Sequence, residues 1–180
     1  MAFLAIENTA SSSSILPPPP PPPSSDEWIY TYDVFLSFRG TDTRNKFTDH
    51  LYNRLEQKGI FTFRDDERLN RGTLIAPELF RAIKESRIAV VILSSDYASS
   101  RWCLAELAKI VECMEMKKLR VLPVFHYVDP RDVRNQRSTF GEAFEKHNER
   151  CKDNTEDLQW WRAALTKVAD LAGWTLDNNK

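Results

Sequence analysis

The chain has 180 residues, and its 25 Lys and Arg side chains nearly balance its 26 Asp and Glu side chains, which gives a formal net charge of -1. This balance argues against a protein that holds nucleic acid through an overall positive charge. No apolar run reaches the roughly 18 residues of a membrane-spanning helix, and the three cysteines lack metal-ligand or disulfide spacing. We therefore expect no membrane segment, no metal site and a reducing compartment, cytoplasmic or nuclear.

The first 31 residues differ in composition from the rest of the chain. Residues 17–23 are seven consecutive prolines, and serine runs lie on both sides of them. A proline run adopts an extended conformation and buries no core. We expect residues 1–31 to be a disordered tail, residues 32–176 to be one folded domain, and residues 177–180 to be a short C-terminal tail.

Short apolar runs alternate with segments of helical periodicity throughout the expected domain. The runs predict strands at 32–38, 61–63, 88–93 and 119–127; the periodic segments predict helices at 43–58, from 76, and at 102–118, 138–150 and 157–172. Such alternation predicts an α/β fold with a doubly wound, mainly parallel sheet of four to five strands and helices on both faces. A fifth strand is possible, but the sequence does not show where it lies.

Four local details accompany this prediction. Thr41 or Asp42 is expected to cap the first helix, and Gly173 to end the last one. Pro123 cannot donate to a sheet ladder, so its strand is expected near an edge or at a bulge. Residues 128–135 are expected to form an irregular loop.

The segment Arg39–Arg44 follows the first strand and opens the first predicted helix. Free N–H groups at a helix start favour anions, Gly40 allows close approach of a ligand, and the two arginines can pair with phosphate. The alternative is a capped turn whose arginines pair with local carboxylates.

Glu106 lies about 90° from the centre of the apolar stripe of its predicted helix, at 100° per residue. Trp102 lies one turn earlier on the same edge of the stripe. A carboxylate that is half withdrawn from water beside an indole can serve as a stabilising anion. The alternative is a surface glutamate that pairs with Lys109 or Arg101.

Three further features are weaker. The charged loop 64–73 can be a lid, a partner surface or merely a solvated connection. Ser94 ends the third strand but has no paired histidine to activate it as a nucleophile. His50, His126 and His147 show no ligand spacing, so they are expected at the surface or in packing.

Taken together, several motifs resemble those of plant TIR domains, the Toll/interleukin-1 receptor-like domains of plant immune receptors. They run in the family's order across residues 32–176: Tyr32-Asp-Val-Phe-Leu-Ser-Phe-Arg-Gly40, Phe61-Thr-Phe-Arg-Asp65, Arg71-Gly72, Arg101-Trp-Cys-Leu-Ala-Glu-Leu107, Val128-Asp-Pro130, Phe140-Gly141 and Gly173-Trp174. The resemblance implies a flavodoxin-like fold and hydrolysis of NAD⁺ (or NADP⁺) as a substrate rather than a cofactor. It also implies homo-oligomerisation with other TIR domains as the activating step.

The resemblance also assigns roles to residues. Glu106 stands at the position of the family's catalytic glutamate, and residues 64–75 match its mobile loop. The nucleotide-contacting positions correspond to Arg39, Gly40, Thr41, Asp42, Thr43, Arg44, Gly72 and Trp102. Many members carry Ser-His on the first helix at a self-association surface, where this chain has Asp49-His50.

Two other functions compete with NAD⁺ hydrolysis. A non-catalytic module that recruits a partner receptor through TIR–TIR contacts would use the same helices and loop. A phospho-receiver domain shares the expected fold but needs an acidic pair after the first strand. Here that position holds Phe38-Arg39-Gly40, so we set the receiver interpretation aside.

Overall fold

A computed structural model describes residues 29–43, 47–64, 76–116, 118–150 and 155–177. One five-stranded sheet runs through the described part of the chain, in the order β2-β1-β3-β4-β5, with every neighbouring pair parallel. The strands are β1 (Tyr32–Phe38), β2 (Thr62–Arg64), β3 (Ser86–Leu93), β4 (Arg120–His126) and β5 (Trp174–Leu176). This doubly wound order confirms the predicted α/β, flavodoxin-like fold.

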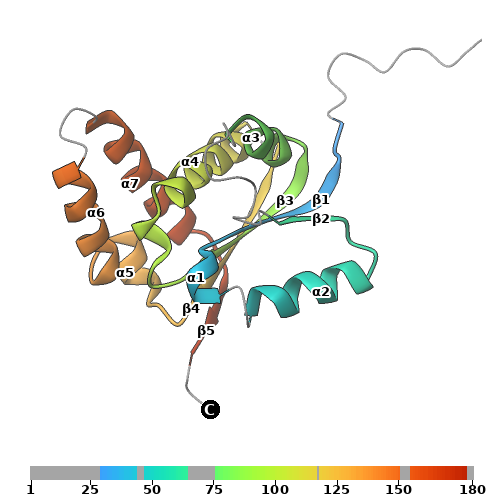
Figure 1. Ribbon diagram of the computed structural model, residues 1–180, viewed down its shortest axis with the longest axis horizontal. Helices are drawn as coiled ribbons and strands as arrows, with labels where there is room; N and C mark the ends of the chain where they lie inside the picture. The colour runs from blue at the N-terminus through green and yellow to red at the C-terminus, as the bar shows by residue number, and fades with distance from the viewer. Residues whose placement is uncertain (1–28, 44–46, 65–75, 117, 151–154, 178–180) are drawn as a thin grey trace, which may run out of the picture.

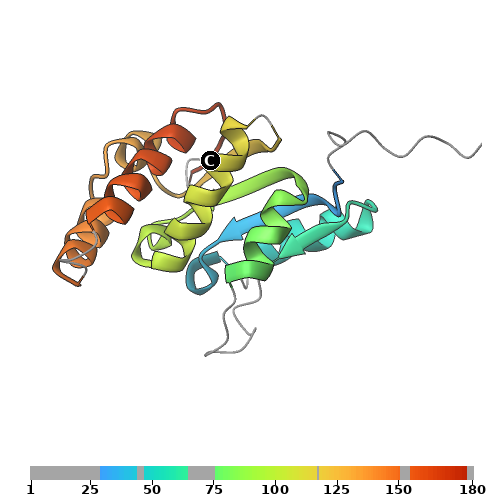
Figure 2. The ribbon, with the colours of Figure 1, turned by 90° about the horizontal axis from the view of Figure 1, so that it is seen from above.

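Helices cover both faces of the sheet. They are α1 (Gly40–Thr43), α2 (Asp49–Gln57), α3 (Ala76–Lys84), α4 (Arg101–Glu115), α5 (Pro130–Arg134), α6 (Thr139–Arg150), α7 (Thr155–Ala169) and the 3₁₀ turn η2 (Tyr97–Ser99). Figure 1 shows α3 and α4 on one side of the sheet and α2 on the other. In the turned view, α7 lies alongside α4, with α6 farther out (Figure 2). No helix of the described segments is long and apolar enough to span a bilayer.

The larger core fills the space between the sheet and α3, α4 and α7. Phe35 of β1 and Val91 and Leu93 of β3 are fully buried there, against Leu104 and Leu107 of α4. Each such side chain contributes roughly 1.5–3 kcal/mol of transfer free energy relative to exposure. This packing fixes the position of α4 on the sheet.

The smaller core lies on the α2 side. Because side chains alternate along a strand, Val34, Leu36 and Phe38 of β1 point to this face. Leu51 and Leu55 of α2 cover them but stay half-buried. α2 is therefore buried less deeply than α4.

The start of the first helix differs from the prediction. The helical turn α1 already begins at Gly40, so Thr41 and Asp42 lie inside it and neither caps a helix that starts at 43. The hydroxyl of Thr43 donates instead to the carbonyl of Arg39, 3.1 Å away. The longer helix α2 then begins at Asp49.

The segment 128–135, predicted to be an irregular loop, contains the short helix α5. The side chain of Asp129 accepts a hydrogen bond from the Arg131 N–H, and Pro130 occupies the first turn, where its missing donor costs nothing. Both are helix-start signals that the sequence carried.

The C-terminal edge of the sheet explains Pro123 and Gly173. β4 lies one place in from the edge, and β5 pairs with it only from Val124 onward, just after the proline. This agrees with a strand near the edge. Gly173 does not end the last helix, which stops at Ala169; a Cβ on Gly173 would lie 2.3 Å from the carbonyl oxygen of Pro123. Glycine is thus required for β5 to approach β4.

Candidate functional site

The end of β1 and the turn after β3 meet at the carboxyl edge of the sheet. The Arg39 Nε lies 3.5 Å from an Asp96 carboxylate oxygen, and the Thr41 hydroxyl donates to that same oxygen at 3.2 Å. β1 and β3 are neighbours from which the chain proceeds in opposite directions across the sheet. Such a switch point is the usual ligand position in open α/β sheets.

Beneath this turn, buried hydroxyl groups fix the backbone of the predicted Arg39–Arg44 segment. Thr43 is fully buried; it donates to the Arg39 carbonyl and accepts from the hydroxyl of Thr48 at 2.9 Å. Arg39 and Gly40 lie half-buried above them. The capped-turn alternative is correct in one respect, because Arg39 does pair with a local carboxylate. Arg44 lies outside the described residues, as does the side chain of Asp42.

Glu106 is only 3% exposed. The buried residues of α4 extend beyond its apolar stripe to the edge where Glu106 lies. Lys109, one predicted surface partner, pairs with Glu112 at 2.8 Å, and the Arg101 guanidinium lies 6.0 Å from the Trp161 ring centroid. The description of Glu106 as an exposed surface glutamate is therefore wrong.

Two neighbours define the surroundings of Glu106. Trp102, one turn earlier on α4, is half-buried and packs against the larger core. Tyr97 is fully buried, and its pKa lies well above the ordinary value, first because of desolvation and then because of the nearby Cys103 and Glu106. The carboxylate thus lies within electrostatic reach of this tyrosine. Sequence reasoning did not select Tyr97, whose only signal is an aromatic residue in a serine-rich turn.

The start of α4 is fixed by its own cap. The hydroxyl of Ser100 accepts a hydrogen bond from the Cys103 N–H at 3.2 Å, so the helix that carries Trp102 and Glu106 begins at a defined residue. Gly72 and the rest of the loop 65–75 lie outside the described residues. The structure therefore brings Arg39–Thr43 and Asp96 together at one edge of the sheet. The start of α4 contacts the end of β1, just before this segment.

The weaker candidates resolve in different ways. Ser94 is buried, and its hydroxyl has no hydrogen-bond partner in the described part of the chain, so no base activates it. His147 is a packing residue, as predicted: it is buried and bonds the Ala98 carbonyl at 2.8 Å. The described segments hold no group of three His, Cys, Asp or Glu residues that could bind a metal ion.

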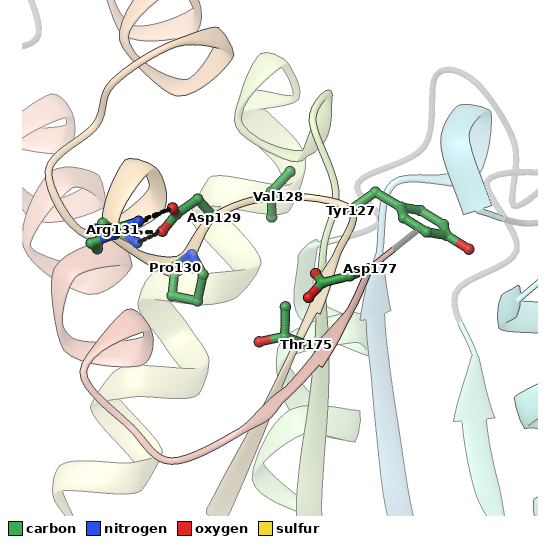
Figure 3. A pocket seen from close by; sticks show the side chains of 7 residues that line it. All are labelled: Tyr127, Val128, Asp129, Pro130, Arg131, Thr175 and Asp177. Carbon is green, nitrogen blue, oxygen red and sulfur yellow. Dashed lines mark hydrogen bonds and ion pairs between the residues drawn. The ribbon is translucent and has the colours of Figure 1, made fainter. Parts of the chain in front are cut away.

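A separate open groove of about 530 Å³ lies at the carboxyl ends of β4 and β5 (Figure 3). It is lined by Tyr127, Val128, Asp129, Pro130, Arg131, Thr175 and Asp177. None of these is a predicted site residue. The Arg131 side chain and N–H both bond Asp129 and lower the pKa of that exposed carboxyl to about 2. The groove is open, its Asp129 carboxylate is already paired with Arg131, and its other carboxylate is that of Asp177. We therefore regard it as a weaker candidate than the surroundings of Glu106.

Comparison of this chain with known proteins identifies its family. The family model described as "TIR domain" matches residues 31–180. The chain belongs to the TIR domain family. The match spans every strand and helix of the described structure, including β1 at one end and β5 at the other.

The sequence of this TIR domain is similar to those of plant disease resistance proteins. It is 54% identical over 149 residues to TMV resistance protein N of Nicotiana glutinosa and 57% identical over 146 residues to disease resistance protein RPV1 of Vitis rotundifolia. These alignments cover 83% and 81% of this chain but only 13% and 10% of the two relatives. The chain thus corresponds to a small part of each.

A solved structure supports the TIR fold directly. The TIR domains in the structure of the activated Roq1 resistosome, which recognises the pathogen effector XopQ, are 52% identical to this chain. The superposition has a TM-score of 0.75 and covers 83% of this chain and 90% of the other. At this identity, the likeness extends to the arrangement of the strands and helices that carry the site.

Proposed function

We propose that this TIR domain hydrolyses NAD⁺ and that Glu106 is its catalytic carboxylate. The observation that carries the proposal is the burial of Glu106 on a helix behind the switch point of the sheet. Burying a carboxylate costs several kcal/mol unless hydrogen bonds or charges compensate, so such groups concentrate at functional sites. The family resemblance assigns the same residue.

A single carboxylate is sufficient for this reaction. Ordinary glycosidases need a second one to protonate a poor leaving group. In NAD⁺ the nicotinamide is already cationic; it takes the electron pair of the C1′–N bond and departs neutral. Glu106 would stabilise the positive charge that develops on the ribose, and water would then add to C1′ with loss of a proton.

The loop after β1 would hold the rest of the substrate. Arg39 is half-buried and turned toward Asp96, so its guanidinium is held at the carboxyl edge of the sheet rather than extended into solvent. Guanidinium groups pair well with phosphate oxygens, and NAD⁺ carries two phosphates. Gly40, Thr41, Asp42, Thr43, Arg44, Gly72 and Trp102 remain the other proposed contacts.

The relatives suggest the biological setting. The named relatives are plant disease resistance proteins, and the matched TIR domains come from an activated resistosome. We propose that this TIR domain signals in plant innate immunity, in the cytoplasm, and that self-association completes its site. Diluting the purified protein should therefore lower its specific activity; turnover per molecule that is independent of concentration would contradict the self-association.

The decisive experiment measures nicotinamide release from NAD⁺ at high protein concentration. We expect Glu106→Gln to reduce release by at least about 100-fold, the usual effect of removing one transition-state electrostatic contact. Glu112→Gln is the matched control, because Glu112 lies on the same helix but pairs with Lys109. Equal activity of both variants would place the reaction elsewhere.

The second candidate function is a non-catalytic TIR–TIR interaction module. It is favoured by the likeness to domains of an assembled complex. Absence of nicotinamide release from the wild-type protein, in a sample whose self-association is confirmed, would support this module and reject the hydrolase.

A further inference from the structure

Three buried side chains join the end of β1 to the first turn of α4. The Ser37 hydroxyl lies 2.8 Å from the Tyr97 hydroxyl, and the Tyr97 hydroxyl donates to the Cys103 carbonyl at 3.2 Å. The Cys103 thiol in turn donates to the Phe38 carbonyl at 3.6 Å. The chain of bonds therefore leaves β1 at Ser37 and returns to β1 at Phe38.

The hydrogen count fixes the direction of each bond. A tyrosine hydroxyl has one hydrogen, and here it goes to the Cys103 carbonyl, so Ser37 must donate to Tyr97. Ser37 and Tyr97 are fully buried and Cys103 nearly so, so bulk solvent does not reach these groups. Loss of the Tyr97 hydroxyl would therefore leave a buried donor and a buried acceptor without this contact.

This circuit lies between the two parts of the candidate site. Ser37 and Phe38 directly precede the Arg39–Thr43 segment. Cys103 directly follows Trp102 and lies one helical turn before Glu106. Tyr97 belongs to η2, which connects the turn after β3 with the start of α4.

We propose that Tyr97 is a positioning residue that sets the distance between the end of β1 and Glu106. It is too deeply buried to contact a substrate, so it acts through the two backbones that it connects. This inference rests on the proposed NAD⁺ hydrolysis, in which the segment after β1 holds the nucleotide and α4 supplies the carboxylate. Displacement of a catalytic group by about 1 Å can cost about 100-fold in rate.

The main test is steady-state hydrolysis of NAD⁺ by Tyr97→Phe, which keeps the ring and removes the hydroxyl. We expect kcat to fall by about tenfold or more, with KM changed by less than about threefold, because ground-state contacts to the nucleotide remain. Tyr30→Phe is the matched control: it also removes a bond from a tyrosine hydroxyl to a main-chain carbonyl, that of Lys118, away from the Arg39 loop. An unchanged kcat in Tyr97→Phe, or an equal loss in both variants, would overturn the inference.

A second readout does not depend on activity. Alkylation of each cysteine can be followed by mass spectrometry; Cys103 and Cys113 are both buried. If Tyr97 holds α4 against β1, Tyr97→Phe should accelerate labelling of Cys103 by several-fold and leave Cys113 unchanged. Parallel acceleration at both cysteines would indicate general loosening and would contradict a specific link.

Ser37→Ala is the second variant, in case the tyrosine substitution prevents folding. It should lower kcat less than Tyr97→Phe does, because Tyr97 still donates to Cys103. The double variant should be no slower than Tyr97→Phe alone, since both changes break one circuit; full additivity would contradict it. If wild type releases no nicotinamide, the proposed function and the kinetic role fail, whereas the Cys103 labelling still decides whether the link exists.

Discussion

The two faces of the sheet are packed to different depths. On one face, Leu104, Leu107 and Ile110 of α4 are fully buried between the strands and α7, whereas no residue of α2 on the other face is buried. Ile88 and Val90 of the central strand β3 remain half-buried on the α2 side. The proposed catalytic carboxylate of Glu106 lies on the deeply packed face. Close packing therefore fixes the position of the side chain on which the proposed chemistry depends.

The largest effect on stability is expected on the deeply packed face. Leu107→Ala in α4 removes a fully buried side chain next to Glu106 and should lower the free energy of unfolding by about 2–5 kcal/mol. Urea denaturation followed by circular dichroism measures this change. A loss below about 1 kcal/mol would mean that α4 repacks easily and that the two faces are alike.

A smaller effect on stability is expected from the matching change on the α2 face of the sheet, which is packed less deeply. Leu51→Ala in α2 removes a side chain that is only half-buried, so the loss should be about 1–2 kcal/mol. The same denaturation experiment compares it with Leu107→Ala. If Leu51→Ala were the more damaging of the two, the contrast between the faces would be wrong.

The smallest effect is expected at Asp129, which caps α5 at the periphery. Its folded-state pKa of about 2 lies below the ordinary 3.8, mainly because of the Arg131 side chain. The sign follows from linkage: the contribution to stability is present above about pH 4 and is lost as the pH falls through about 2. Because the Asp129–Arg131 pair lies at the surface, where solvent screens it, this contribution is small.

NMR titration of the Asp129 carboxyl group between pH 5 and pH 2 tests this expectation. The midpoint should lie near 2 in the wild type and move toward 3.8 in Arg131→Ala. An ordinary midpoint in the wild-type protein would show that the ion pair does not persist in solution.

Most of the fold was predictable because long apolar runs and helical stripes are strong signals. The sequence did not assign β5, since Trp174–Leu176 has only three residues, too few for their alternation to be a signal, and most of it is exposed. α5 could have been found from Asp129-Pro130, a cap followed by a first-turn proline. The start of α1 could not, because no sequence rule places a helical turn directly at Gly40 after a strand.

The site was predictable in part. The wheel placed Glu106 at the edge of its stripe, but only the folded structure shows that this edge is covered and lies close to the buried Tyr97. The partner of Arg39 was not predictable, since Asp96 is 57 residues away and reaches it only when β1 and β3 pair. Tyr97 was overlooked for the same reason: its contacts with Ser37 and Cys103 come from three separate elements.

The all-parallel order of the sheet also has a consequence for how the chain is made. Parallel neighbours cannot join by a hairpin. β1 is synthesised before its sheet partners β2 and β3, and it pairs with them only after the intervening helices exist: Tyr32 lies opposite Ser86. Such distant pairings close slowly. The apolar side chains of β1 therefore stay unpaired until β3 has been synthesised. During that interval we expect the nascent chain to be prone to aggregation.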